Sequence, residues 1–384
     1  MKQYLLAPGP TPVPPAVLLA MARPMIHHRT PEYEALFADV RRDLRLLFQC
    51  KNEVLMFAAS GTGAMEGAVV NTLSPGDRVI VVRGGKFGER WADICQAYGL
   101  HVFPVDVPYG KSVDPAAVAG ALERAPASKA VFATHSETST GAVHDIQALA
   151  GIVLRTEALL VVDAITSLGV MDLPMDAWGV DVVVSGSQKA LMLPPGLSFA
   201  ALSDRAWERV PLARLPKFYF DFVRERKAIV GNQSAYTPAV SLVVGLRETL
   251  RLILTEGLPG VFARHDRLAR AARAGVQALG LTLFAEHPGA ACTAVTAPPG
   301  DRRRRGREGD AEAWHHHRGG PGQHEGKDVP HLPHGLRGPL RRPHRPERPG
   351  NGPGRPRTSG ELRRGRRCGP TRPASIAELR GGER

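Results

Sequence analysis

Residues 182–191 read VVVSGSQKAL, so a run of three valines passes directly into small polar residues and a lysine, Lys189. A short apolar run without polar alternation is typical of a strand buried on both faces, as in a parallel sheet. Ligands of such sheets bind beyond the carboxyl ends of the strands, and Lys189 follows its strand at that end. A partly desolvated lysine there can act as an imine-forming nucleophile, although most loop lysines are solvated.

The same pattern repeats outward from this run over the first 297 residues. Apolar runs that predict buried strands are Val54–Ala58, Val79–Val82, His101–Val105, Ala130–Ala133, Leu159–Val162 and Val180–Val184. Amphipathic segments that predict helices between them are Glu34–Phe48, Gly63–Thr72, Phe87–Tyr98, Pro115–Ala125 and Ile146–Arg155. Strands that alternate with helices predict an α/β fold whose mostly parallel sheet is covered on both faces.

Two other predicted strands also end in residues with useful chemistry. Residues 58–66, AASGTGAME, follow a strand and open a helix, where backbone N–H groups and the helix dipole favour an anion. A tight turn in which Ser60 is the N-cap of the helix would show the same sequence pattern. Asp163 ends an apolar run, and a buried carboxylate must be solvated, paired or used; capping the next helix is its other reading. An anion-binding turn, an acid and then Lys189 on one sheet indicate a cofactor site.

With Pro194-Pro195-Gly196, the run around Lys189 resembles the lysine signature of class V aminotransferases, which depend on pyridoxal phosphate (PLP). The alanine–glyoxylate/serine–pyruvate branch is the most similar. The resemblance extends over residues 3–297 and includes Ala7–Pro12 (APGPTP), Ser60–Gly63 with Glu66, and His135–Gly141 (HSETSTG). It implies PLP fold-type I, with a large domain built on a mostly parallel sheet and a smaller C-terminal α/β domain.

The resemblance also implies a role for each site residue. Lys189 would hold PLP covalently and, once released by the amino-acid substrate, would act as the general base that moves the substrate α-proton. The residues placed around the cofactor are Asp163 at the ring nitrogen, Ser60, Gly61, Thr62 and Gln188 at the phosphate, Thr138 near the ring hydroxyl, Phe87 stacked on the ring, and Pro8 and Gly9 on the substrate side. Thr237 would reach the phosphate of a neighbouring subunit, which implies a homodimer with shared active sites. Without the family match, Phe87 and Thr237 read equally well as ordinary packing and a pre-proline turn.

Four segments are predicted on this basis. They are an N-terminal substrate-side segment at 1–20, a PLP-binding large domain at 21–245, the start of the small domain at 246–297, and a basic tail at 298–384. The predicted activity moves an amino group from alanine or serine to a 2-oxo acid such as glyoxylate or pyruvate. The alternatives are a cysteine desulfurase-like enzyme, whose relatives usually carry His where this chain has Gln188, and a catalytically silent relative.

Charge and cysteine content narrow the class of protein. The 384 residues carry a net charge of +13, but residues 301–384 hold 21 Lys+Arg against 10 Asp+Glu, so the preceding part is nearly neutral. No run of 18 or more apolar residues occurs, and the N-terminus lacks the features of a signal peptide. Four scattered cysteines without CxxC spacing argue against disulfides and zinc. We therefore predict a cytoplasmic protein that binds small molecules and neither membrane, metal nor nucleic acid.

The tail differs in kind from the rest of the chain. Residues 301–384 lack Phe, Tyr and Met and contain 16 Gly and 11 Pro, so no apolar periodicity is left from which to build a core. Three interpretations compete. They are a disordered basic tail that binds nucleic acid, a metal-binding tract around His315–His317, and translation in a shifted reading frame.

The hypothesis of a shifted reading frame can be tested on the amino-acid sequence itself. With GC-rich codons read one base later, His315–Arg318 can become Ile-Thr-Ile-Ala, and Val329–Leu336 can become Phe-Arg-Ile-Ser-His-Met-Gly-Tyr. This restored text resembles the C-terminal domain of the family, and agreement of this length is hard to obtain by chance. We therefore interpret the tail as out of frame from Pro298–Gly300. The shift would remove the arginine that binds the substrate carboxylate in relatives, so the chain as written should bind amino acids poorly and leave the apolar face of the small domain uncovered.

Overall fold

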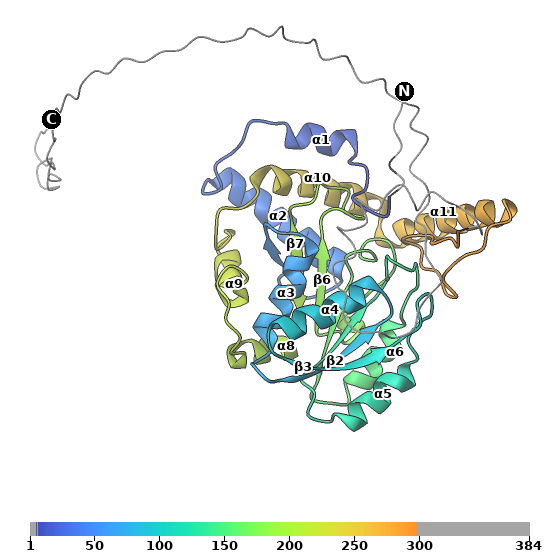
Figure 1. Ribbon diagram of the computed structural model, residues 1–384. Helices are drawn as coiled ribbons and strands as arrows, with labels where there is room; N and C mark the ends of the chain where they lie inside the picture. Colours follow the sequence, from blue (N-terminus) through green and yellow to red (C-terminus); the bar gives the residue numbers. More distant parts are fainter. Residues whose placement is uncertain (1–4, 6, 298–384) are drawn as a thin grey trace, which may run out of the picture. The chain divides into compact units, whose positions relative to one another are not determined.

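The computed structural model describes residue 5 and residues 7–297, and these residues form an α/β fold around one sheet (Figure 1). The six predicted strands are all present, with ends that differ from the prediction by at most two residues. The strands are β1 Leu55–Phe57, β2 Arg78–Arg83, β3 His101–Asp106, β4 Ala130–Thr134, β5 Leu159–Asp163, β6 Val182–Gly186 and β7 Ser198–Leu202. The tail at 298–384, with its three interpretations, lies outside the described residues.

The sheet is mixed, in the order β1-β7-β6-β5-β4-β2-β3. Strands β3, β2, β4, β5 and β6 are parallel, while β7 is antiparallel to both β6 and β1. Asp163 lies between Thr134 of β4 and Val184 of β6, in the middle of the sheet. Strand β7 is not among the strands that the apolar runs predict, because SFAAL is rich in alanine and serine and lacks β-branched residues.

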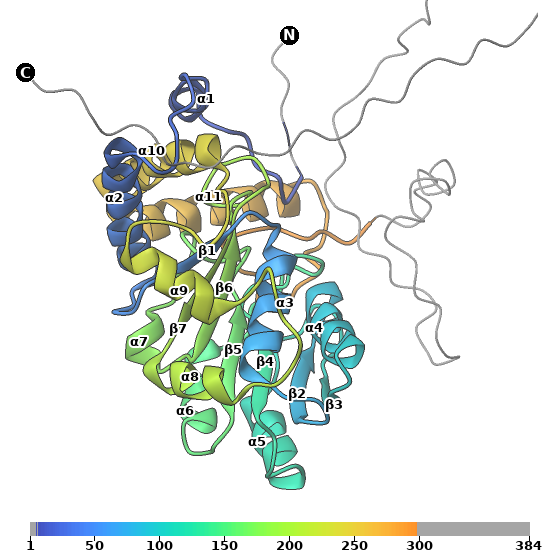
Figure 2. The same cartoon turned by 90° about the vertical axis from the view of Figure 1, so that its left-hand side faces the viewer.

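Helices cover both faces of the sheet. The five predicted helices correspond to α2 Pro31–Phe48, α3 Gly61–Thr72, α4 Lys86–Ala97, α5 Pro115–Arg124 and α6 Ile146–Val153. The structure adds α1 Pro15–Met21, α7 Met175–Trp178, α8 Asp204–Arg209, the 3-10 helix η1 Val210–Leu212, α9 Phe222–Val230, α10 Val240–Glu256 and α11 Leu258–Ala278. Right-handed crossovers place α3 and α4 on one face and α5, α6 and α7 on the other, because the chain reverses direction across the sheet after β3 (Figure 2).

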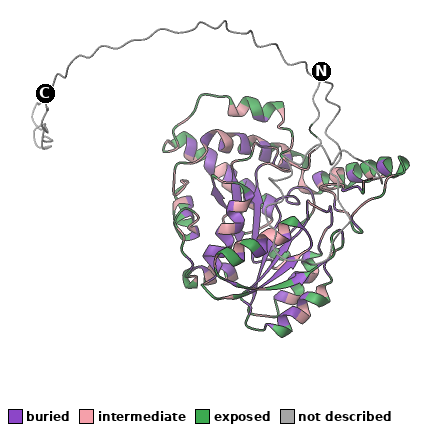
Figure 3. Ribbon diagram, viewed as in Figure 1, coloured by how far each residue is buried: buried purple, intermediate pink, exposed green. Residues whose placement is uncertain are grey.

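The core is centred on the sheet (Figure 3). Every residue of β1, β4, β5, β6 and β7 is buried, which explains why these strands read as continuous apolar runs. Helix α3 is also buried along most of its length, and its sequence GTGAMEGAVVNT accordingly shows no polar face. Because these strands and α3 are buried, the carboxyl edge of the sheet is a rigid support for the residues that follow the strands.

The last two helices run from the region predicted as the large domain into the region predicted as the start of the small domain. Helix α10 is continuous through the predicted boundary at 245/246 and packs on α1 and α2. Helix α11 buries Val261, Ala269 and Val276, whereas Leu268 is 55% exposed and Leu279, at its end, is 77% exposed. Apolar residues at this end of the described chain thus remain open to solvent. None of the described helices is long and apolar enough to cross a membrane.

Candidate active site

Most of the predicted site residues meet at the carboxyl edge of the sheet. Lys189 follows β6, Asp163 is the last residue of β5, Thr138 follows β4, and Ser60 follows β1. Strand β1 points the same way as β6 because both are antiparallel to β7. The four connections therefore leave the sheet at one edge, where a ligand is expected in folds of this kind.

Lys189 lies beneath the N-terminal segment. Its Nζ donates a hydrogen bond to the carbonyl oxygen of Pro8 at 2.6 Å. Gly9 approaches so closely that a Cβ on it would lie 2.6 Å from Lys189 Nζ, and its φ of +147° is a conformation that side-chain-bearing residues rarely adopt. Thr11 fastens the segment, since its Oγ1 donates to the carbonyl oxygen of Lys189 at 2.8 Å and its N–H to that of Gln188 at 3.0 Å. Pro8 and Gly9 thus contact the lysine directly.

The Lys189 amine is not that of a solvated loop lysine. Burial lowers its pKa from the usual value, while the neighbouring Cys292 and Asp163 act in the opposite direction. A lowered pKa leaves a larger fraction of the amine unprotonated at neutral pH, and the unprotonated amine is the form that attacks a carbonyl carbon or accepts a proton.

Asp163 is a buried acid with few partners. Its side chain is 3% exposed, and its Oδ1 accepts a hydrogen bond from the Ile165 N–H at 2.8 Å. Burial, with a smaller contribution from Glu137, raises its pKa to about 7, although the Ile165 hydrogen bond and the charges of Arg90 and Lys189 oppose the shift. The N-cap reading is wrong, because the next helix, α7, begins at Met175 and has Pro174 as its N-cap. A cationic N–H donor beside Asp163 would stabilise its ionised form.

We expect Asp163 to make the cofactor-free protein less stable as the pH rises. The folded pKa of about 7 lies above the usual 3.8, so folding takes up a proton between these values and the stabilisation is lost as the pH rises through 7. Relative to Asp163→Asn, the wild type should lose roughly 2–3 kcal/mol of unfolding free energy between pH 5 and pH 8. Denaturant unfolding of both proteins at the two pH values measures the difference. His135, His144 and Glu225 titrate in both proteins and cancel, so equal pH dependence of the two would contradict the expectation.

The glycine-rich turn before α3 offers unused donors. Ser60 occupies the N-cap position of α3 and is exposed, but its side chain makes no capping hydrogen bond. Its position therefore agrees with the N-cap interpretation, whereas its hydroxyl group has no capping role. The buried Oε1 of Gln188 has no hydrogen-bond partner in the described part of the chain. A Cβ on Gly186 would lie 2.8 Å from this oxygen and 3.3 Å from the Gly61 nitrogen, so the Gln188 carboxamide lies beside the start of α3. The N–H groups at the α3 start and the Ser60 hydroxyl are donors that fit an anion such as a phosphate, toward which the Gln188 carboxamide would present its NH₂ group.

The start of α4 is glycine-rich as well, but a carboxylate of the chain already accepts hydrogen bonds from its N–H groups. The Glu137 carboxylate accepts hydrogen bonds from the N–H groups of Phe87 and Gly88, each at 3.1 Å. The two helix starts at this edge are therefore not equivalent, and the α3 start is the one left for an external anion. Glu137 belongs to the HSETSTG run, in which the family resemblance gives it no role of its own. The signal that finds Asp163, an acid just after a buried strand, applies to Glu137 too.

Phe87 and Thr138 flank this region from two elements. The guanidinium of Arg90 lies over the Phe87 ring, 4.7 Å from the centroid, and donates to Thr62 Oγ1 at 3.1 Å. Thr138 Oγ1 is hydrogen-bonded to Thr166 Oγ1 at 2.5 Å. Arg90 and Thr166 are residues that the sequence analysis missed, because neither falls in a motif and each is brought in by packing.

Thr237 stands apart from the other predicted residues. It is exposed, and it lines a surface hollow of about 600 Å³ together with His27 and His28. It also lines a small cavity beside the buried carboxyl of Glu225. Its predicted contact, with the phosphate of a neighbouring subunit, stays a prediction.

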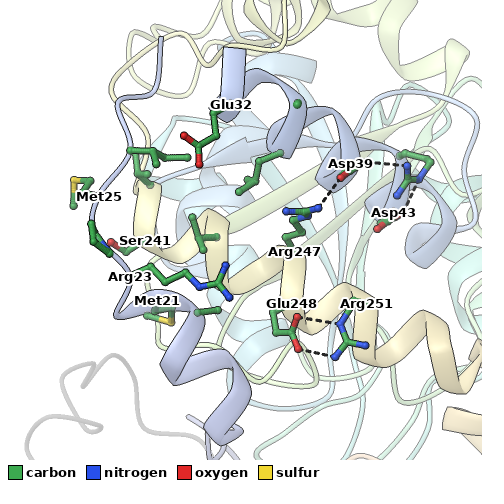
Figure 4. Close-up of a pocket in the computed structure, with 18 of the residues that line it drawn as sticks. Met21, Arg23, Met25, Glu32, Asp39, Asp43, Ser241, Arg247, Glu248 and Arg251 are labelled. Atoms are coloured by element: carbon green, nitrogen blue, oxygen red, sulfur yellow. Dashed lines mark hydrogen bonds and ion pairs between the residues drawn. The ribbon is translucent and has the colours of Figure 1, made fainter. Parts of the chain in front are cut away.

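A larger groove lies elsewhere on the molecule. It has a volume of about 1120 Å³ and is lined by residues of α1, α2 and α10 and of the α1–α2 connection (Figure 4). Several of its charges pair with one another, as in Arg247–Asp39 at 3.3 Å and Arg251–Glu248 at 2.7 Å. None of the predicted site residues lines this groove, so the volume of a cavity does not by itself identify the catalytic site.

The residues at the sheet edge fit the predicted cofactor. Lys189 supplies an amine of lowered pKa, and Asp163 supplies a buried carboxyl group whose pKa is raised. The α3 start, whose N–H groups and Ser60 hydroxyl are donors, supplies an anion site, with the Gln188 carboxamide beside it. These three features match an aldehyde, a ring nitrogen and a phosphate, respectively.

Known proteins resemble this chain over most of its length. Residues 3–299 match the family described as aminotransferase class-V. The soluble hydrogenase 42 kDa subunit of Anabaena cylindrica is 47% identical over 302 residues, which are 77% of this chain and 79% of the relative. The L-aspartate–glyoxylate aminotransferase of Paracoccus denitrificans is 41% identical, covering 74% of this chain and 73% of the relative. The serine–glyoxylate aminotransferase of Hyphomicrobium methylovorum is also 41% identical, covering 74% and 72%.

Solved structures show the same likeness in three dimensions. The alanine–glyoxylate aminotransferase of Nostoc sp. superposes with a TM-score of 0.76 at 31% identity, covering 86% of this chain and 89% of that one. The fold predicted from strand and helix alternation is thereby confirmed.

Proposed function

This chain belongs to the class V aminotransferases, enzymes that use pyridoxal phosphate, and we propose that it moves the amino group of alanine or serine to a small 2-oxo acid such as glyoxylate or pyruvate. The observation that carries the proposal is Lys189, held under Pro8 and Gly9 at the same sheet edge as Asp163. Gly9 approaches Lys189 closely, and this crowding supports a substrate with a small side chain. Two of the relatives named above use serine or alanine with glyoxylate.

The roles of the residues follow from their positions. Bound PLP supplies an electron-withdrawing ring that accepts charge from a substrate carbon losing its proton. Asp163 would hold the ring nitrogen in its protonated form, and the α3 start with Gln188 would bind the phosphate. Lys189 Nζ, with its lowered pKa, is the group that can take and return the proton of the substrate α-carbon. The Pro8–Gly9 segment would cover the reacting atoms and limit access of water.

The desulfurase alternative is disfavoured by the state of the cysteine beside Lys189. Burial raises the pKa of Cys292 to about 11, whereas a nucleophilic cysteine needs a lowered pKa. The silent-relative alternative is tested by the Lys189 variant discussed below.

We expect alanine and serine to be better donors than aspartate. The full chain, loaded with PLP, is mixed with each amino acid at equal concentration, and the spectral change of the cofactor is followed over a single turnover before any oxo acid is added. Alanine and serine should react at least about ten-fold faster than aspartate, because aspartate would place a second carboxylate near a site that already contains Asp163 and Glu137. An equal or faster reaction with aspartate would contradict the proposed donor class.

A homodimer with shared sites and a cytoplasmic location are further parts of the proposal. Thr237 is exposed, and this supports a contact with a second copy. Cys50, Cys95 and Cys292 are free thiols, as suits a reducing compartment.

We also propose that the chain as written is impaired. The family match stops at residue 299, beside the predicted frame change at Pro298–Gly300. The exposed Leu268 and Leu279 on and after α11 support the loss of a covering domain.

A further inference from the structure

Glu137 is a fully buried carboxylate at the edge of the site. It lies in the loop after β4, next to Thr138, and is 0% exposed. Four donors surround it, from two separate elements. Its Oε2 accepts from the N–H groups of Phe87 and Gly88 at 3.1 Å each, and its Oε1 accepts from the Ser139 N–H at 3.1 Å and the Ser139 hydroxyl at 2.6 Å. One side chain therefore joins the β4 loop to the first turn of α4.

The chemistry of this contact suits an ionised carboxylate. The first N–H groups of a helix lack partners within the helix and carry the positive end of its dipole. Burial raises the pKa of Glu137, but its hydrogen bonds with Ser139, Gly88 and Phe87 oppose that shift. Both oxygens of the Glu137 carboxylate accept hydrogen bonds. Glu137 therefore caps the start of α4, although it lies in the loop after β4 and not next to the helix in sequence.

Gly85 makes room for the carboxylate. A Cβ at this position would lie 2.4 Å from Glu137 Cγ and 2.5 Å from Ser139 Oγ. The same serine hydroxyl accepts from the Lys86 N–H at 3.0 Å, so the α4 start is held at three successive residues. An arrangement this close leaves little freedom for the first turn of α4 or for Phe87 on it.

We propose that Glu137 is a positioning residue for the cofactor ring: it locks the α4 start to the β4 loop, so that Phe87 and Thr138 keep one fixed spacing across the site. The proposal rests on the proposed function, because it takes Phe87 as the stacking partner of PLP. Glu137 touches neither substrate nor cofactor in this role. It acts through the backbone of Phe87 and through its neighbour Thr138.

The first experiment tests the lock itself. Hydrogen–deuterium exchange of the full chain, with and without PLP, measures the amides of Phe87 and Gly88. In Glu137→Gln, the side-chain NH₂ must face one pair of donors, so exchange of these two amides should rise by about ten-fold or more. Glu89→Gln is the matched control, because Glu89 lies on the same turn and makes a half-exposed pair with Lys86. Glu89→Gln should leave both amides as in the wild type.

The second experiment tests the effect on the cofactor. PLP is titrated into each protein, and its dissociation constant and the circular dichroism induced in its absorption band are measured. Glu137→Gln should bind PLP about ten-fold more weakly, with a reduced induced signal, because a ring free to tilt has no fixed asymmetric environment. In a Phe87→Ala background the same substitution should change the dissociation constant less than about three-fold, because the two residues act as one unit.

The outcomes separate this proposal from the proposed function. If the wild type binds no PLP, the proposed function fails and the positioning role fails with it. If the wild type binds PLP and Glu137→Gln matches it in affinity and induced signal, the positioning role alone is overturned. Should Glu137→Gln not fold, Ser139→Ala removes one donor and must show the same changes at smaller size, roughly two- to three-fold. A Ser139→Ala protein identical to the wild type would then overturn the proposal.

Discussion

Replacing Lys189 with alanine should abolish covalent attachment of PLP to this protein. The chain loses the amine that lies under Pro8 and faces Asp163, and no other group stands in its place at this edge among the described residues. Absorbance of the bound cofactor, followed by borohydride reduction and peptide mapping, checks the result. In the wild type the reduced label should lie on the peptide that contains Lys189, and in Lys189→Ala it should be missing.

The same substitution should also stop proton transfer. General acid–base catalysis contributes roughly 100- to 10,000-fold, so exchange of the substrate α-proton with solvent should fall by that order. Lys217→Ala is a suitable control, since the Lys217 ammonium also donates to backbone carbonyls, those of Val70 and Ala213 at 3.4 and 3.2 Å, away from the site. A Lys189→Ala protein that keeps the label or the exchange would overturn the assignment of Lys189, and a wild type without either would favour the silent relative.

Restoring the reading frame near the codons for Pro298–Gly300 should raise transamination strongly. The chain as written should turn over alanine or serine with glyoxylate weakly or not at all, because the arginine expected to pair with the substrate carboxylate is missing. Losing one partner of a buried charge pair costs about 2–5 kcal/mol, so kcat/KM should rise roughly 30- to 5,000-fold on restoration. The restored chain should also unfold at higher temperature, because a complete small domain can cover the apolar residues at the end of α11.

A chain that stops after residue 297 is the control for this comparison. It should behave like the chain as written, since both lack the predicted domain and differ only in the basic tail. Robust turnover by the purified chain as written would contradict the predicted impairment. Sequencing of the DNA around codons 296–302 decides whether the shift lies in the gene.

Much of the fold follows from local patterns. Valine-rich runs such as Val182–Val184 form strands because β-branched side chains suit a sheet buried on both faces, and this holds wherever the run lies in the chain. The alternation of strands with helices then predicts that most strands of the sheet are parallel. Strand β7 escapes this reasoning, because Ser198–Leu202 is made a strand by its two antiparallel neighbours and not by its own letters.

The candidate site divides in the same way. The residues that end or follow the strands, among them Lys189, Asp163 and the turn at Ser60, can be found from the sequence alone, because a buried run followed by a polar residue is a local signal. Only the tertiary structure brought Pro8 onto Lys189 and Glu137 onto the start of α4. These two contacts join residues 181 and 50 positions apart, and their energies arise from burial and hydrogen bonding that exist only once the sheet has assembled.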